Sequence, residues 1–292
     1  MKSKKYAFAA AVSGVVLMGA ILFLQQQGTS FFKPKPTVHV AATIFPLYDL
    51  VKGIGGDFVT TDLLLPTGNP PEAAKNILQN IDSASYDAVF AIGQGFDETA
   101  ASADLKPNIV TVDHGIDLLL QEGSTASPYY WLSLKNSAIM AATIADRLGT
   151  LDPSHREQFK KNAAGFIDRA GQLDQSIKKL IAAAPQKKMV VYGRDWEYFA
   201  RDYGITIVYA LPVTSEPPTA AAIGELLAAA RANDIHALVA DVYVTPAPLL
   251  AFLQTGRYSI INLDALGGSS DLTDYLILMN YNAQSIVTAL TS

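Results

Sequence analysis

The stretch DPSHREQFKKNAAGFIDRAGQLDQSIKKLIAAAP, residues 152–185, interrupts a regular alternation of short apolar runs and decides how the chain is divided. Its first two residues are a helix-start signature, because Asp caps free backbone N–H groups and Pro fits the first helical position. We predict one helix over Pro153–Ala184, roughly 48 Å long at 1.5 Å per residue. Apolar residues recur at helical spacing until Pro185, at Phe159, Ala163, Phe166, Ile167, Ala170, Leu173, Ile177, Leu180 and Ile181.

A helix of this length could join two lobes or could pair with a partner helix in a coiled coil. Gly165 and Gly171 disfavour the coiled coil, because each costs about 1 kcal/mol in a free-standing helix. We therefore expect four parts, listed in chain order: a signal or membrane anchor with its tether (1–37), an N-terminal α/β lobe (38–151), the linking helix (152–185) and a C-terminal α/β lobe (186–292).

Short apolar, β-branched runs alternate with helical patterns on both sides of this stretch. Such alternation is typical of parallel sheets covered by helices on both faces. The fold class is α/β, with two lobes that each hold a parallel sheet flanked by helices. The predicted strands are Val38–Phe45, Val59–Leu65, Ala88–Gly93, Ile109–Val112, Met189–Tyr192, Thr206–Ala210, Ala237–Val242 and Ser259–Leu263, and the helices between them include Tyr48–Gly53, Glu72–Ile81, Ala138–Leu148 and Ala220–Asn233.

The N-terminus predicts export. Lys2, Lys4 and Lys5 precede the low-polarity run 6–24, in which Ser13 is the one polar residue. The run is close to the roughly 20 residues that span a bilayer and longer than the apolar core of most cleavable signals, so we favour an uncleaved anchor over a cleaved signal. Lysines before the run keep that end in the cytoplasm, which places the remainder in the periplasm or on the outer face of the membrane.

The composition excludes several classes of site and partner. The chain has no cysteine, so disulfides, thiolate metal sites and a lipid anchor on a cysteine are all excluded. Its formal net charge of −5 is a poor match for nucleic acid. We find no dinucleotide, phosphate-binding, zinc-protease or nucleophile-elbow motif, and the pair Asp97-Glu98 reads as solvated surface, so we do not expect an enzyme.

Several short motifs, taken together and in their order along the chain, resemble those of a known protein family. ATIFPLYD at 42–49 is followed by IGGD at 54–57, by Pro128 with Trp131 and Leu132, and by LDALGG at 263–268. From Val38 to Leu290 the chain resembles the zinc/manganese-type substrate-binding proteins of ABC transporters. That resemblance implies a stiff two-lobed clamp, an ABC permease as partner in the membrane, and zinc or manganese as the possible cargo.

The resemblance also implies four metal-ligating positions, and they fall on Pro71, Tyr129, Gly193 and Asp264. Zn²⁺ and Mn²⁺ prefer imidazole and carboxylate ligands. Proline and glycine carry no donor, and a phenol with a pKa near 10 is a poor ligand at neutral pH. Asp264 alone keeps a suitable side chain, so we expect metal binding to be weak, altered or lost. An alternative interpretation of Asp264 is a carboxylate that caps the turn before Gly267.

A shift of one residue in the alignment would bring Glu72 or Asp195 into the site. Glu72 reads more simply as the third residue of a helix capped by Asn69. Arg194 beside the third position could pair with Asp264 or Asp195, or could hold a carboxylate or phosphate on an organic solute.

Tyr129, Tyr130 and Trp131 could line the cleft as an aromatic wall, although core packing is the simpler interpretation of Trp131. The four histidines, at 39, 114, 155 and 236, match none of the four positions and read as structural or solvated. The sequence therefore leaves open a weak or unusual metal binder, a binder of a small anionic solute, and a metal-free scaffold or regulatory protein.

Overall fold

The computed structural model describes residues 36, 38–75, 77–97, 108–120, 125–193, 196–212, 218–243 and 258–292. Residues 1–36 and 37–292 form separate units, and all the helices and strands described here belong to the second. The expected anchor at 6–24 and the candidates Arg194 and Asp195 lie outside the described residues. Within the described ranges, no helix has the length and hydrophobicity that crossing a bilayer requires.

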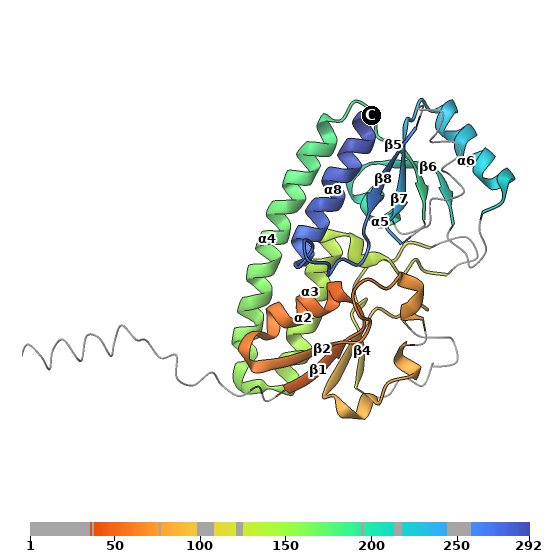
Figure 1. The fold of residues 1–292 in the computed structure, drawn as a ribbon. Coiled ribbons are helices and arrows are strands. Elements are labelled where there is room, and N and C mark those ends of the chain that lie inside the picture. The colour runs from red at the N-terminus through yellow and green to blue at the C-terminus, as the bar shows by residue number, and fades with distance from the viewer. Residues whose placement is uncertain are drawn as a thin grey trace, which may run out of the picture. The chain divides into compact units, whose positions relative to one another are not determined.

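The first lobe is built on a parallel sheet with strand order β2-β1-β3-β4 (Figure 1). Its strands are β1 (Val38–Ala42), β2 (Val59–Leu63), β3 (Ala88–Ala91) and β4 (Ile109–Thr111). Helix α2 (Phe45–Gly55) follows β1 directly, because Pro46 at its first turn supplies a helical φ and needs no N–H partner. Helix α3 (Leu134–Leu151) begins where the Ser133 side chain accepts a hydrogen bond from the Asn136 amide.

The second lobe repeats the arrangement, with strand order β6-β5-β7-β8 and parallel pairing throughout. Its strands are β5 (Lys188–Tyr192), β6 (Thr206–Leu211), β7 (Ala237–Asp241) and β8 (Ser259–Leu263). Its helices are α5 (Glu197–Tyr203), α6 (Ala220–Ala232) and α8 (Tyr275–Thr291). The predicted two-sheet α/β fold is therefore confirmed.

The predicted linking helix is present as α4 (Arg156–Ala183), preceded by a single 3₁₀ turn, η7 (Pro153–His155). Asp152 caps that turn by accepting the Ser154 amide at 3.1 Å. The helix packs against α2 and α3 of the first lobe and against α5 and α8 of the second. Its apolar stripe is buried against these neighbours, so a separate coiled-coil partner is not needed to cover it.

The predicted helix over Glu72–Ile81 is wrong. The described chain there forms two short 3₁₀ helices, η2 (Pro71–Ala74) and η3 (Ile77–Gln79). Lys75 leaves the helical region with a ψ of 127°, which ends η2 after one turn. Asn69 does not cap this helix, because its side-chain amide donates to the Pro66 carbonyl instead, at 3.0 Å.

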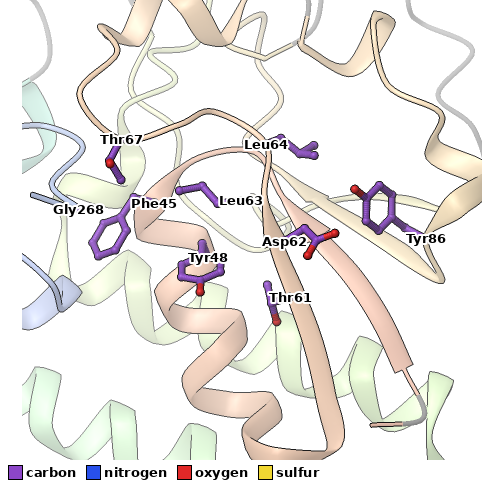
Figure 2. A pocket seen from close by; sticks show the side chains of 9 residues that line it. All are labelled: Phe45, Tyr48, Thr61, Asp62, Leu63, Leu64, Thr67, Tyr86 and Gly268. Atoms are coloured by element: carbon purple, nitrogen blue, oxygen red, sulfur yellow. The ribbon is translucent and has the colours of Figure 1, made fainter.

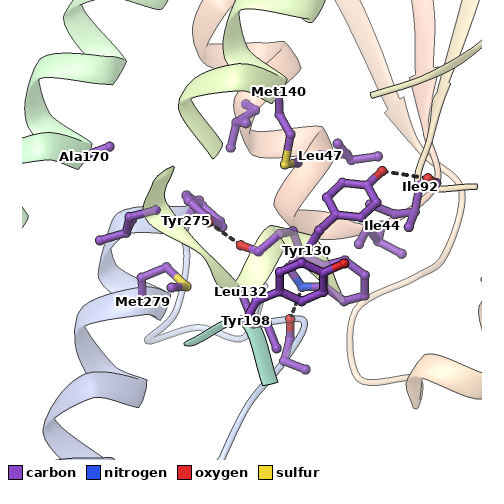
Figure 3. Close-up of a cluster of buried hydrophobic side chains, with 14 of the residues drawn as sticks. Ile44, Leu47, Ile92, Tyr130, Leu132, Met140, Ala170, Tyr198, Tyr275 and Met279 are labelled. Carbon is purple, nitrogen blue, oxygen red and sulfur yellow. Dashed lines mark hydrogen bonds between the residues drawn. The ribbon is translucent and has the colours of Figure 1, made fainter. Parts of the chain in front are cut away.

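The two lobes share one continuous hydrophobic core, which Figure 3 shows near its centre. Ile44 and Leu47 of the first lobe meet Tyr275 and Met279 of α8 around the short helix η6 (Tyr130–Leu132). Polar contacts cross the same region, because the Tyr275 hydroxyl donates to the Trp131 carbonyl and Trp131 Nε1 donates to the Ala265 carbonyl at 2.8 Å. Burial and hydrogen bonding thus tie the lobes together directly, in addition to the linking helix.

Candidate functional site

The four positions implied by the sequence all follow parallel strands at the carboxyl ends of the two sheets. Pro71 lies beyond β2 and Tyr129 beyond β4, whereas Gly193 and Asp264 directly follow β5 and β8. Strands β5 and β8 both pair with β7, so Gly193 and Asp264 lie on either side of β7 at the carboxyl ends of the strands. Binding sites of parallel α/β sheets lie at this edge.

Asp264 is held in place by its own loop and by α8. Its side chain is buried, and Oδ1 accepts the backbone amides of Leu266 and Gly267 at 2.9 and 2.8 Å. The Asn282 side chain bonds to both the amide and the carbonyl of Asp264. The turn-capping interpretation is therefore confirmed, and one carboxylate oxygen is already engaged by two donors.

Two neighbours of Asp264 were missed in the sequence. Asp241 ends β7 and is 3% exposed, and its Oδ1 accepts the Tyr243 amide at 2.9 Å. Burial, followed by the charges of Asp264 and Asp241, raises the pKa of the Tyr243 phenol, which therefore stays protonated at neutral pH. Asp241 ends β7 and Asp264 directly follows β8, but the pairing of these two strands, which brings the residues together, has no signal in the sequence.

Tyr129 lies beside the Asp264 loop. Its ring contacts Phe96 and Trp131, with centroid separations of 5.8 and 5.1 Å. The hydrogen bond from Trp131 to Ala265 then fixes this segment next to the residue that follows Asp264. Tyr129 is half-buried, but Tyr130 and Trp131 are both 0% exposed. The three-ring aromatic wall is therefore wrong, because two of its rings form the shared core, and the interpretation of Trp131 as a core residue is confirmed.

The other two positions offer no metal ligand. Gly193 has a φ of 142°, a backbone conformation that residues other than glycine rarely adopt. Its amide donates to the Leu211 carbonyl at 2.9 Å. Pro71 is buried at the start of η2, and Glu72 beside it is exposed. Across the described residues, no three His, Cys, Asp or Glu side chains gather closely enough to hold a metal ion.

The loop after Asp264 touches the loop that leads to Pro71. A Cβ atom on Gly268 would lie 2.4 Å from Thr67 Cγ2 and 2.9 Å from the Phe45 ring. The same three residues line one end of an open groove of about 590 Å³, which continues along the edge strand β2 to Asp62 and Tyr86 (Figure 2). Gly268 therefore makes a close contact between the lobes beside the candidate site.

The remaining polar candidates have structural partners elsewhere. Asp97 is completely buried, which corrects its interpretation as solvated surface, and its carboxylate accepts the Thr43 hydroxyl and the amides of Ile92 and Gly93. Burial raises the pKa of Asp97, and these three hydrogen bonds oppose the rise. Three histidines contact carboxylates away from the site, in the pairs His39–Asp62, His155–Asp152 and His236–Asp234.

Comparison with known proteins agrees with this architecture. Residues 40–289 match the family model described as "ZnuA: Zinc-uptake complex component A periplasmic". The manganese ABC transporter substrate-binding lipoprotein PsaA of Streptococcus pneumoniae is 26% identical over 310 residues, covering 98% of this chain and 99% of that protein. The metal ABC transporter substrate-binding lipoprotein ScbA of Streptococcus cristatus is 26% identical over 276 residues, covering 87% of this chain and 89% of that protein.

Solved structures share the fold. A crystal structure of ZnuA superposes with a TM-score of 0.73 at 24% identity, over 87% of this chain and 99% of that one. A manganese-bound periplasmic metal-binding protein from Candidatus Liberibacter asiaticus gives a TM-score of 0.73 at 22% identity, over 87% of this chain and 100% of that one. Because the family model spans most of the residues, the chain belongs to the family of periplasmic zinc-uptake component A proteins.

Proposed function

We propose that this chain is the extracytoplasmic solute-binding component of an ABC transporter, with a metal site that has lost three of its four ligands. Family membership and the names of its relatives support the transport role. The observation that carries the altered site is the set of residues at the three positions matched to the family's other ligands, which are a proline, a half-buried tyrosine and a glycine at positive φ.

A carboxylate alone binds zinc and manganese weakly, because tight sites in proteins use several nitrogen or oxygen donors in fixed geometry. One oxygen of the Asp264 carboxylate already accepts hydrogen bonds from two backbone amides. The residues of the site therefore fit a weakly held cation better than a tightly held one. Tyr243 and Asp241 supply the other polar groups near Asp264, a protonated phenol and a buried carboxylate.

The domain boundaries and the membrane attachment form part of the same proposal. Residues 38–151 and 186–292 act as the two lobes of the clamp, and 152–185 links them. The named relatives are lipoproteins, whereas the 292 residues contain no cysteine. We therefore propose that residues 6–24 hold the protein at the outer face of the membrane, beside an ABC permease.

Calorimetry on the chelator-stripped chain tests the proposal. Titration with Zn²⁺ and with Mn²⁺ should show dissociation constants no tighter than about 10 μM, or about −7 kcal/mol. Sub-micromolar binding that disappears in Asp264→Ala would contradict it, because an intact high-affinity site would then exist around Asp264.

A further inference from the structure

Strand β2 forms one edge of the first sheet. Among the described residues its one neighbouring strand is β1, with which it pairs in parallel. The Leu64 amide, just beyond β2, donates to the Ala42 carbonyl of β1 at 2.9 Å. Because the bonding groups alternate in direction along a strand, the N–H and C=O groups of Thr61 and Leu63 face away from β1. An edge of this kind is a template for a further strand.

The open groove of about 590 Å³ follows this edge, and side chains from both faces of the sheet line it (Figure 2). Successive side chains of a strand point to opposite faces. Thr61 and Leu63 lie on the face that carries α2, where Phe45 and Tyr48 also line the groove. Lys52 of α2 already lies 5.5 Å from the centre of the Tyr48 ring, so a second cation is disfavoured there. This wall therefore suits an apolar side chain.

The wall on the opposite face carries a negative charge. Asp62 is the one charged residue of β2, and its side chain is 47% exposed beside Tyr86. The His39 ring contacts both residues, with Nε2 at 2.9 Å from Asp62 Oδ2 and 4.9 Å between the centres of the His39 and Tyr86 rings. A half-exposed carboxylate next to an aromatic ring attracts the head group of a lysine or arginine.

We propose that β2 accepts an extended segment of a partner protein as an added strand, in which apolar and basic side chains alternate. The backbone of that segment bonds to the outward N–H and C=O groups of Thr61 and Leu63. Its apolar side chains lie against Phe45 and Tyr48, and its basic side chains lie beside Asp62. Added strands gain affinity from such main-chain bonds and specificity from the pockets that take alternate side chains.

The dimensions and the charge of the edge define this partner. The five residues of β2 span about 17 Å, so a segment of about five or six residues covers the edge. A second copy of β2 is a poor occupant, because pairing two such strands brings two Asp62 carboxylates to one interface, where like charges oppose association. A basic segment meets no such repulsion.

Two hexapeptides test the added strand, one alternating valine with lysine and the other alternating valine with glutamate. Fluorescence anisotropy measures both affinities for the full chain in detergent at about 150 mM salt, where distant charges are screened. We expect the lysine peptide to bind at least about tenfold more tightly than the glutamate peptide. Hydrogen exchange with the lysine peptide bound should show added protection of the amides in 59–64, and none in the edge strand β6.

Asp62→Lys reverses the charge of the edge and leaves its backbone in place, so the preference should invert in favour of the glutamate peptide. Asp168→Asn is the matched control, because Asp168 is an exposed carboxylate of α4, away from the groove, and this variant should keep the original preference. An inverted preference also shows that the Asp62→Lys variant is folded.

The added strand is refuted if the lysine peptide does not bind below about 1 mM, or if it binds without added protection of β2. Equal affinities of the two peptides, or an Asp62→Lys variant that still prefers lysine, would refute it as well. None of these outcomes depends on Asp264 or on metal binding, so this proposal and the proposed function can fail separately.

Discussion

Replacing Gly268 with alanine tests the close contact between the lobes. Gly268 has a φ of 79°, where an L-residue costs about 1–2 kcal/mol. The added Cβ would also lie 2.4 Å from Thr67 Cγ2 and 2.9 Å from the Phe45 ring. Thr67 is exposed and can move aside, but Phe45 is 8% exposed and packed, so overpacking adds about 1–3 kcal/mol.

The expected loss in the free energy of unfolding is therefore about 2–5 kcal/mol, measured by urea denaturation. Gly224→Ala is the matched control, because Gly224 lies inside α6 and its added Cβ would meet no atom within 4 Å. That variant should gain about 0.5–1 kcal/mol from the lower conformational entropy of its unfolded chain. An unfolding free energy of Gly268→Ala within about 0.5 kcal/mol of the unmodified protein would refute the interlobe contact.

Two further substitutions probe the polar contacts that fix the site and the linking helix. Tyr198→Phe removes a hydroxyl that donates to the Ser127 carbonyl and accepts the Leu119 amide, so urea denaturation should show a loss of about 1–3 kcal/mol. Tyr209→Phe should change stability little, because its hydroxyl makes an exposed hydrogen bond to Glu225. Asp152→Ala removes the cap before α4 and should cost about 0.5–2 kcal/mol, with unchanged stability contradicting the assigned cap.

The lobes and the linking helix were predictable because their signals are local. Asp152, Pro153 and Pro185 mark the ends of α4 by their own chemistry, and the apolar spacing between them needs no knowledge of the partner surface. The same kind of reasoning failed at 72–81. There the choice between an α-helix and two 3₁₀ turns depends on the backbone at Lys75 and on the contact between Asn69 and Pro66.

Burial of polar and aromatic residues was harder to predict, because it depends on contacts distant in sequence. Tyr130 could be read from the sequence as part of an accessible wall, yet its hydroxyl donates to the Ile92 carbonyl inside the core. Asp97 resembles a surface acid in the sequence, but in the structure it accepts a hydrogen bond from the Thr43 hydroxyl, 54 residues away. The bond between Asp49 and the Tyr275 amide has no local signal at all.

Of the candidate site, Asp264 and its turn could be predicted, because an Asp followed by glycines specifies that geometry locally. The proximity of Asp241 and Tyr243 could not be predicted, because it requires the order of the strands. Arg194 and Asp195 lie outside the described residues, so the pairing of Arg194 with Asp264 or Asp195 stays a prediction.

Placing imidazoles at two of the four positions tests the proposed altered site most directly. Calorimetry should compare Zn²⁺ binding to the unmodified chain, to the double variant Pro71→His with Tyr129→His, and to that variant with Asp264→Ala added. We expect the double variant to bind zinc at least about tenfold more tightly, a gain of about 1.4 kcal/mol, and the third change to abolish the gain. An unmodified chain that already binds zinc below about 1 μM, or a double variant with no gain, would contradict the proposed loss of ligands at these positions.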